Sequence, residues 1–126
     1  SGNPVASVIN QAENALYYTC TDKNTCYYAL LSGSKCKDND SVPMLMSSNL
    51  GVTQITGMCF NNGETSLLML TPYSAANPVI RGGTQIGIAI PLESGMFKVV
   101  RFSLNGSKNA IEWCEKMSTP KDETYL

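Results

Sequence analysis

The sequence predicts a mainly β protein, α+β by element count, in which an antiparallel sheet or sandwich of about six or seven short strands carries an N-terminal and a C-terminal helix. Two observations support this fold class. Short segments rich in aromatic and β-branched residues follow one another, with turn residues between them. Helical periodicity is confined to the two ends, and because no helix separates the central strands, parallel βαβ winding is excluded.

The size and charge of the chain restrict what it can be. Its 126 residues predict a single domain over 1–126, with a flexible start at 1–3 and a polar tail at 118–126. Nine basic residues against ten acidic ones give a net charge of −1, without the basic stripe that is typical of a nucleic-acid-binding protein. The longest apolar runs cover only a few residues, which predicts no membrane-spanning segment.

The first predicted element is an amphipathic helix over residues 4–16. Asn3 followed by Pro4 is typical of a helix start, because asparagine caps the first turn and proline fits its first position. This helix is predicted to pack on the sheet, since its polar face lacks the lysine and arginine of a membrane-surface helix. Apolar residues recur along it at helical spacing: Val5, Val8, Ile9, Ala12, Ala15 and Leu16.

The segment over 16–31 predicts a hairpin of two strands with a turn at 22–24. Pairing the strands places Cys20 opposite Cys26 and brings tyrosines of the two strands together. Dense tyrosine is typical of recognition surfaces, although aromatic pairs across strands also serve ordinary sheet packing. The candidate binding residues are the four tyrosines of this hairpin: Tyr17, Tyr18, Tyr27 and Tyr28.

The middle of the chain predicts a polar loop followed by further strands. The loop at 32–41 lacks the central glycine and the closing glutamate of a calcium loop, so no metal site is predicted there. A short strand at 43–47 precedes a hairpin over 52–71. The Asn62-Gly63 step of that hairpin suits a type I′ turn, which needs two residues tolerant of positive φ.

The last third of the chain predicts a loop, two strands and a helix. Prolines, glycines and small residues predict a loop over 71–83, with a short edge strand at 79–80. Isoleucine at alternate positions predicts a half-buried strand over 84–90. The segment 97–117 then predicts a strand, a tight turn and a helix, and Cys114 lies on the apolar stripe of that helix.

Five cysteines in a chain of this size favour disulfide bonds, and therefore an oxidising compartment, either periplasmic or secreted. The sequence has no C-x-x-C pair, which argues against zinc and redox motifs. Hairpin geometry predicts a Cys20–Cys26 bridge. A cysteine on a core-facing helix predicts Cys59–Cys114 with Cys36 as a free thiol, and the alternative is Cys36–Cys59 with Cys114 buried and free. The odd cysteine also allows a homodimer linked between chains.

The residues that catalysis needs do not gather into a recognisable pattern. The sequence has no histidine, which removes Ser-His-Asp and Cys-His catalysis and histidine metal ligation. Its carboxylates are scattered over turns and over the last helix, where Glu112 and Lys116 have the spacing of an ordinary ion pair. We therefore expect no enzymatic activity, no catalytic residue, no metal and no cofactor.

Two stretches carry a family resemblance. The strand, turn and helix near the end show a pattern at Phe102, Leu104, Gly106, Ser107, Ala110, Ile111 and Cys114. The segment from Tyr17 to Cys26 adds an aromatic strand with two close cysteines. Together they resemble small exported bacterial domains of the invasion-associated locus B family and related periplasmic β-sandwich proteins. The resemblance implies an exported, β-rich, disulfide-bonded bacterial protein that acts by contact rather than by catalysis.

The leading hypothesis is a non-enzymatic, virulence-associated bacterial protein that binds another protein at the envelope or at a host interface. Three alternatives stay open. An inhibitor of a secreted hydrolase would insert the loop at 32–41 or at 71–83 into an active site. A small carbohydrate- or lipid-binding module would line a pocket with Trp113, Tyr73 or the tyrosine hairpin. A pilin-like subunit would use residues 4–16 as the remnant of a longer assembly helix.

Overall fold

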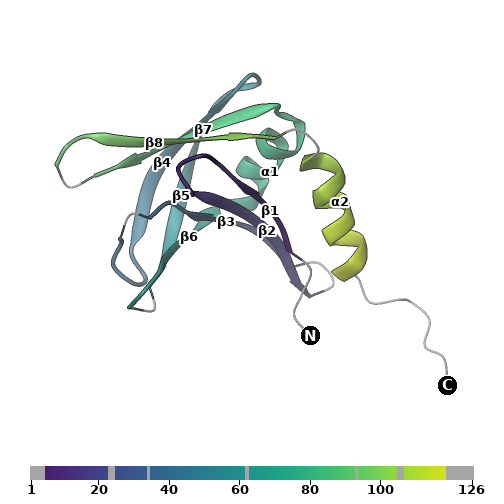
Figure 1. Cartoon of the computed structure of the whole chain (residues 1–126), viewed down its shortest axis with the longest axis horizontal. Helices are drawn as coiled ribbons and strands as arrows, with labels where there is room; N and C mark the ends of the chain where they lie inside the picture. The colour runs from purple at the N-terminus through teal and green to yellow at the C-terminus, as the bar shows by residue number, and fades with distance from the viewer. Residues whose placement is uncertain are drawn as a thin grey trace.

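The computed structural model of this chain consists largely of β-strands and describes residues 5–22, 25–33, 35–61, 63–92, 94–104 and 107–118 (Figure 1). Within these ranges it has eight strands and two helices, which confirms the mainly β class. In chain order they are β1 (Val5–Ile9), β2 (Ala15–Asp22), β3 (Thr25–Leu31), β4 (Ser41–Ser48), β5 (Gly51–Asn61), β6 (Ser66–Thr71), α1 (Tyr73–Gly82), β7 (Gln85–Pro91), β8 (Phe97–Ser103) and α2 (Ser107–Ser118).

The strands form one antiparallel sheet in the order β1-β2-β3-β6-β5-β4-β7-β8. The sheet curves so strongly that its two edge strands, β1 and β8, approach each other and give it a nearly barrel-like shape (Figure 1). Where they approach, the side-chain amide of Asn10 donates to the carbonyl of Arg101 at 3.0 Å. The predicted antiparallel sheet is therefore one curved sheet rather than a sandwich, and it has more strands than expected.

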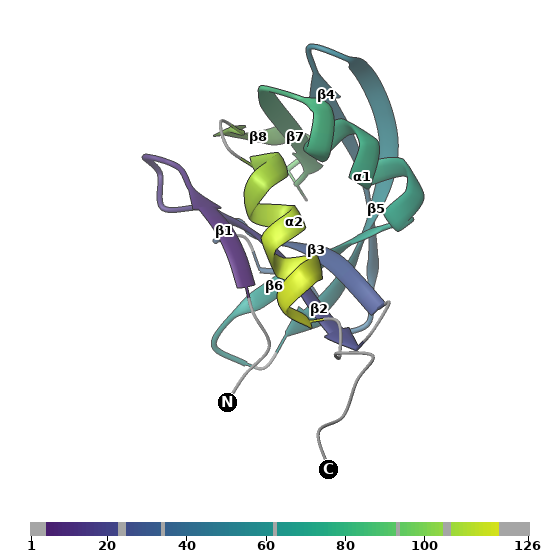
Figure 2. The same ribbon diagram turned by 90° about the vertical axis from the view of Figure 1, so that its right-hand side faces the viewer.

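The core lies on the inner face of the curved sheet, where alternate residues of most strands are buried. Helix α1 adds Ala76 and Ile80 to it, and α2 adds Ile111 and Cys114. Figure 2 looks onto α2, which lies across the open side of the sheet. The predicted packing of the C-terminal helix through its apolar stripe is confirmed. Fully buried strand residues include Cys20, Tyr28, Leu30, Met46, Cys59, Leu70, Ile88 and Val100.

The predicted helix over residues 4–16 is wrong, because Val5–Ile9 form strand β1 and pair with β2. The side-chain oxygen of Asn10 accepts the backbone N–H groups of Ala12 and Asn14, at 3.0 and 2.9 Å, and so builds the turn between the two strands. The β1 residues fit a helical period but do not alternate, since Val5 and Ile9 lie on the exposed face. Their β-branched side chains favour the strand, and pairing with β2, with Ala6 and Val8 packed against the core, decides between the two.

The predicted loop over 71–83 is also wrong, together with its short edge strand, because Tyr73–Gly82 form helix α1. Ala76 and Ile80 are one helical turn apart, and both are buried against the sheet. Pro78 lies inside this helix, where it removes one backbone hydrogen bond. Proline, glycine and small residues suggested a loop, but burial of the apolar stripe outweighs the cost of the proline.

The remaining predicted elements are confirmed. The tyrosine hairpin is β2–β3, with Cys20 opposite Cys26. The later hairpin is β5–β6, and the final strand and helix are β8 and α2. The predicted flexible start at 1–3, residues 23–24 of the turn at 22–24, Asn62 of the predicted type I′ turn, the turn at 105–106 and the polar tail beyond residue 118 lie outside the described residues.

Gly57 is expected to tolerate no larger side chain, because it faces the core from β5. A Cβ at this position would lie 2.8 Å from Met44 Cε and 3.2 Å from Leu68 Cβ. Gly57→Ala should therefore lower the free energy of unfolding by about 1–3 kcal/mol, as overpacked cores do. Urea denaturation measures this. The matched control is Gly87→Ala, whose Cβ would meet Ser47 Oγ at 3.4 Å and should change stability by less than about 0.5 kcal/mol. Equal losses for the two variants would contradict the prediction.

Candidate functional site

The four hairpin tyrosines predicted as binding residues divide between the two faces of the sheet. Tyr18 and Tyr28 lie opposite each other on the inner face and are only 2% and 1% exposed. Tyr17 and Tyr27 lie on the outer face and are partly exposed. Neighbouring strand residues point to opposite faces, so consecutive tyrosines do not share a surface. A partner could therefore reach Tyr17 and Tyr27 but not the inner pair.

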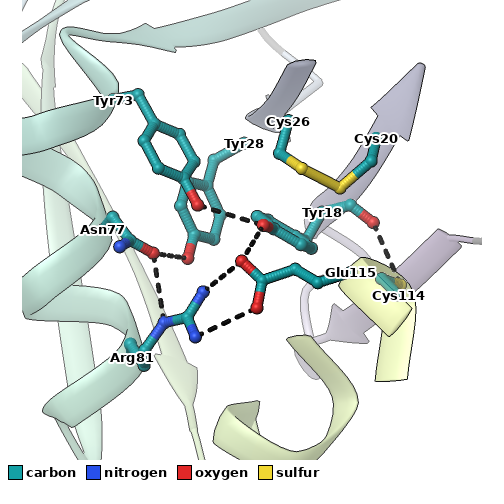
Figure 3. The surroundings of a disulfide bond; sticks show 9 residues. All are labelled: Tyr18, Cys20, Cys26, Tyr28, Tyr73, Asn77, Arg81, Cys114 and Glu115. Atoms are coloured by element: carbon teal, nitrogen blue, oxygen red, sulfur yellow. Dashed lines mark hydrogen bonds and ion pairs between the residues drawn. A yellow bond between two sulfur atoms is a disulfide. The ribbon is translucent and has the colours of Figure 1, made fainter. Parts of the chain in front are cut away.

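The inner tyrosines form an aromatic cluster with Tyr73 of α1 (Figure 3). The ring centroids of Tyr18 and Tyr28 are 4.7 Å apart, and Tyr28 stacks on Tyr73 at 5.5 Å with an interplanar angle of 18°. Such pairs contribute beyond the area that they bury. The cluster thus holds α1 against the middle of the sheet.

The hydroxyl groups of this cluster continue into polar contacts with both helices (Figure 3). The Tyr28 hydroxyl donates to Asn77 Oδ1 at 2.7 Å. The Tyr18 hydroxyl donates to Glu115 Oε2 at 2.9 Å and lies 3.0 Å from the Tyr73 hydroxyl. Buried phenols are thereby satisfied, as buried polar groups require. We call the whole set the tyrosine–arginine network: Tyr18, Tyr28, Tyr73, Asn77, Arg81 and Glu115.

An ion pair between Arg81 and Glu115 joins α1 to α2 at the centre of this network. The guanidinium binds the carboxylate in a fork, with N···O distances of 3.1 and 2.7 Å. The hydrogen bond from Arg81 lowers the pKa of Glu115, and burial raises the pKa of Tyr18 and of Tyr28. The phenols therefore stay protonated, and the charged groups bind each other. This arrangement fastens both helices to the sheet rather than offering a ligand site.

Glu115→Gln is expected to remove part of the acid sensitivity of the fold. Because the pKa of Glu115 is lowered on folding, its charge stabilises the protein above the unfolded value of about 4.3, and this contribution is lost as the pH falls through the folded value. The side chains of Arg81 and Glu115 are 25% and 36% exposed, so solvent screens the ion pair and the loss of stability should be no more than about 1 kcal/mol.

Urea denaturation of both chains between about pH 7 and pH 3 measures this effect. The difference in free energy of unfolding between the wild type and the Glu115→Gln chain should be constant near neutral pH and shrink in acid. A difference that stays the same down to the lowest pH would contradict the prediction.

The structure forms two disulfides, Cys20–Cys26 and Cys36–Cys59, and leaves Cys114 as a buried free thiol. The predicted Cys20–Cys26 bridge is confirmed. The predicted Cys59–Cys114 bridge with free Cys36 is wrong, and the alternative pairing is the one found.

The positions of the elements explain the pairing. Cys36 lies in the loop at 32–41, which runs beside β5. There the N–H of Asn39 donates to the Cys59 carbonyl at 2.9 Å, and the N–H of Cys59 donates to the Asp40 carbonyl at 2.8 Å. Cys114 instead faces β2, and its Sγ lies 3.7 Å from the Tyr18 carbonyl. Burial raises the pKa of the Cys114 thiol, which argues against a role in linking two chains.

A second surface lies on the outer face of β4, β7 and β8, where apolar side chains are exposed. Leu45 pairs with Ala89, which pairs with Val99, and Phe97 lies at the start of β8. Phe97 and Val99 are 62% and 43% exposed. A groove of about 560 Å³ adjoins Phe97, and none of the described residues that line it is charged. We call this surface the outer patch: Pro43, Leu45, Ala89, Pro91, Phe97 and Val99.

Sequence reasoning missed the outer patch because it assigned a single apolar face to the last strand. Val100 and Phe102 are indeed buried on the inner face. Phe97 and Val99 fall on the opposite face, which they share with Arg101. A strand that is apolar on both faces is the signal that could have revealed this surface.

Within the described ranges, no group of three or more histidine, cysteine, aspartate or glutamate side chains is arranged to hold a metal ion. The same ranges contain no helix that is long and apolar enough to cross a membrane. No family model, no curated protein and no solved structure matches the chain.

Proposed function

We propose that this chain is a non-enzymatic protein that acts by binding another protein, with the outer patch as its contact surface. The observation that carries this proposal is Phe97, a large aromatic side chain that is 62% exposed beside an apolar groove. Exposed apolar patches of this kind are typical of interaction sites, and aromatic anchors dominate binding energy. A partner with an apolar, weakly charged surface would fit it.

We infer that the protein works in an oxidising compartment. Its two disulfides support this, because cytosolic reductants keep thiols reduced in most organisms. A bacterial origin, secretion or a periplasmic location, and a role at the envelope or a host interface rest on the resemblance to invasion-associated locus B domains.

The proposal is tested by placing charge in the outer patch. Immobilised wild-type protein is used to isolate a partner from extracts and culture fluid of the source organism, and the purified partner is then titrated. Phe97→Glu combined with Val99→Glu should weaken binding by about 100-fold or more, since desolvating two carboxylates in an apolar contact is costly.

The matched control carries the same charge change elsewhere, as Leu50→Glu with Trp113→Glu, two apolar residues that are 58% and 50% exposed. It should bind the partner like the wild type. Equal binding by the patch variant and the wild type would refute the proposal. If the Tyr17→Ala or Tyr27→Ala variant loses binding while the outer-patch variant keeps it, the contact surface is the tyrosine hairpin instead.

One observation favours a second candidate, an inhibitor of a secreted hydrolase that uses the loop at 32–41. The Cys36–Cys59 disulfide ties this loop to β5, and Asp38 Oδ1 accepts the backbone N–H of Asn61 at 2.9 Å. Lys37 is exposed on the braced segment. Inhibition of lysozymes and proteases that is lost on Lys37→Ala would support this candidate, and a panel without inhibition would exclude it.

Two other hypotheses lose the observations that suggested them. A pilin-like subunit needed a helix at 4–16, where the structure has β1. The second inhibitory loop, at 71–83, is mostly helix α1. The small-ligand module keeps only the part that rested on the tyrosine hairpin, because Tyr17, Tyr18 and Tyr28 line an apolar cavity of about 160 Å³, whereas the Tyr73 hydroxyl bonds to Tyr18 and Trp113 is half-exposed on α2.

A further inference from the structure

The edge strand β1 directs backbone groups away from the sheet. Within the described residues it pairs with β2 alone. The N–H of Asn10 donates to the Asn14 carbonyl at 3.0 Å, so Asn10 belongs to a hydrogen-bonded pair. Because such pairs alternate along an antiparallel ladder, the even-numbered residues of β1 direct their backbone N–H and C=O groups toward β2. Val5, Ser7 and Ile9 therefore present their N–H and C=O groups on the side of β1 that faces away from β2. Val5 and Ser7 are exposed, and beyond Ile9 this edge approaches β8, where Asn10 bonds to Arg101. A row of such groups is a template for pairing with another strand.

An apolar cavity of about 160 Å³ opens beside this edge. Its walls come from β1, β2, β3, both helices and the end of β8, with Ala6 and Val8 on the β1 side and Ala110 and Ile111 on the α2 side. None of the described residues that line it is charged. An apolar cavity of about 150 Å³ accommodates a group the size of benzene, so this one is large enough for a branched aliphatic side chain.

We propose that β1 and this cavity together bind an extended, uncharged peptide segment of another protein. The segment adds to the sheet as an antiparallel strand along Val5–Ile9. Its backbone pairs with Ser7 and its neighbours, and one aliphatic side chain enters the cavity. Affinity then comes from main-chain hydrogen bonds and specificity from the cavity, as in other cases of strand addition.

The chemistry of the edge favours this occupant. The five residues of β1 carry no charge, and the cavity walls carry none, so a charged side chain entering here would be desolvated without a partner. A β1 strand from a second copy would offer only Ala6 and Val8 on its inner face. Alanine and valine side chains would leave part of the cavity unfilled, whereas the longer side chain of leucine on a separate peptide would fill more of it.

The test uses a capped heptapeptide of alternating threonine and leucine, titrated into isotopically labelled full-length protein and followed by NMR. Binding should shift the amide signals of Val5, Ser7 and Ile9 and protect the Ser7 and Ile9 amides from hydrogen exchange. In antiparallel pairing with leucine in the cavity, the threonine N–H groups donate to β1. N-methylation of the threonine amides should therefore abolish binding, whereas N-methylation of the leucine amides should not.

Two variants locate the site on the protein. Ser7→Pro removes an outward-facing N–H and should weaken peptide binding by about tenfold or more. Ala110→Trp fills the mouth of the cavity from α2, leaves β1 intact, and should weaken binding similarly. The outer-patch variant Phe97→Glu/Val99→Glu should bind the peptide like the wild type, which separates this inference from the proposed function.

Three results would overturn the inference. One is the absence of any shift at about 1 mM peptide, a concentration that would reveal even weak binding. Another is equal binding of the parent peptide and both methylated peptides. The third is a concentration-dependent dimer, detected by sedimentation, that Ser7→Pro abolishes while the wild type does not bind the peptide. In that case the edge of β1 pairs with a second copy of this chain.

Discussion

Removing the Cys36–Cys59 disulfide is expected to lower the free energy of unfolding by about 3 kcal/mol, and removing Cys20–Cys26 by about 2 kcal/mol. The two bridges differ in the length of chain that they close, with sequence separations of 23 and 6. A longer closed loop restricts the unfolded chain more. Cys20 and Cys26 also face each other across a hairpin that strand pairing already holds together.

Urea denaturation of three chains measures the difference: the wild type, Cys36→Ala/Cys59→Ala and Cys20→Ala/Cys26→Ala. The unfolding midpoint should fall furthest for the first double variant. Adding a reductant to the wild type should reproduce the sum of the two effects, since Cys114 lies outside both bridges. Unchanged midpoints in both double variants would contradict the prediction.

The size of this effect links the fold to its environment. Domains of this kind are stable by about 5–15 kcal/mol, so losing both bridges removes about 5 kcal/mol, a large share of the total. A chain that depends on its disulfides to this extent is suited to an oxidising compartment. A wild-type protein that keeps its full stability in reductant would remove the main support for the proposed location.

Sequence patterns predicted those elements whose residues agree at every level. The tyrosine hairpin combines aromatic and β-favouring residues with turn residues between its strands, and the 84–90 strand alternates isoleucine with smaller or polar residues. Both are present, as β2–β3 and β7. The Cys20–Cys26 bridge followed from the first of these, because the hairpin register alone fixes which residues face each other.

The elements that were missed depend on contacts with distant parts of the chain. Val5–Ile9 fit a helical period, and pairing with β2 makes them a strand instead. Helix α1 contains Pro78, which disfavours a helix. A hydrogen bond from Tyr28 of β3 to Asn77 of α1, 49 positions apart in the chain, helps to hold the helix on the sheet. Local propensity cannot register such contacts.

The candidate surface was missed for a related reason. The outer patch joins residues of β4, β7 and β8, and the crossover from β4 to β7 passes over two strands and a helix. The density of tyrosines predicted a binding surface on the hairpin instead. Alternation places Tyr18 and Tyr28 on the inner face, and that face is buried because the whole sheet curves around the core.

Tyr28→Ala is expected to destabilise the fold by about 3–5 kcal/mol, the range for large aromatic truncations in a core. Tyr28 is 1% exposed, its ring packs against two other tyrosines, and its hydroxyl donates to Asn77 at 2.7 Å. Truncation leaves a cavity under α1 and removes the stacking partner of Tyr73. The helix and the tyrosine–arginine network should both loosen.

Thermal or urea denaturation of four single variants measures how stability is divided among the hairpin tyrosines. Tyr28→Phe keeps the ring and should cost about 1 kcal/mol, because Asn77 Oδ1 still accepts from Arg81 at 3.3 Å. Tyr17→Ala and Tyr27→Ala, on the outer face, should each cost less than Tyr28→Ala. If all four variants lose the same stability, the division between faces is wrong. If they divide as expected, the outer pair can be tested for partner binding in folded protein, whereas lost binding in a Tyr28→Ala chain would report unfolding instead.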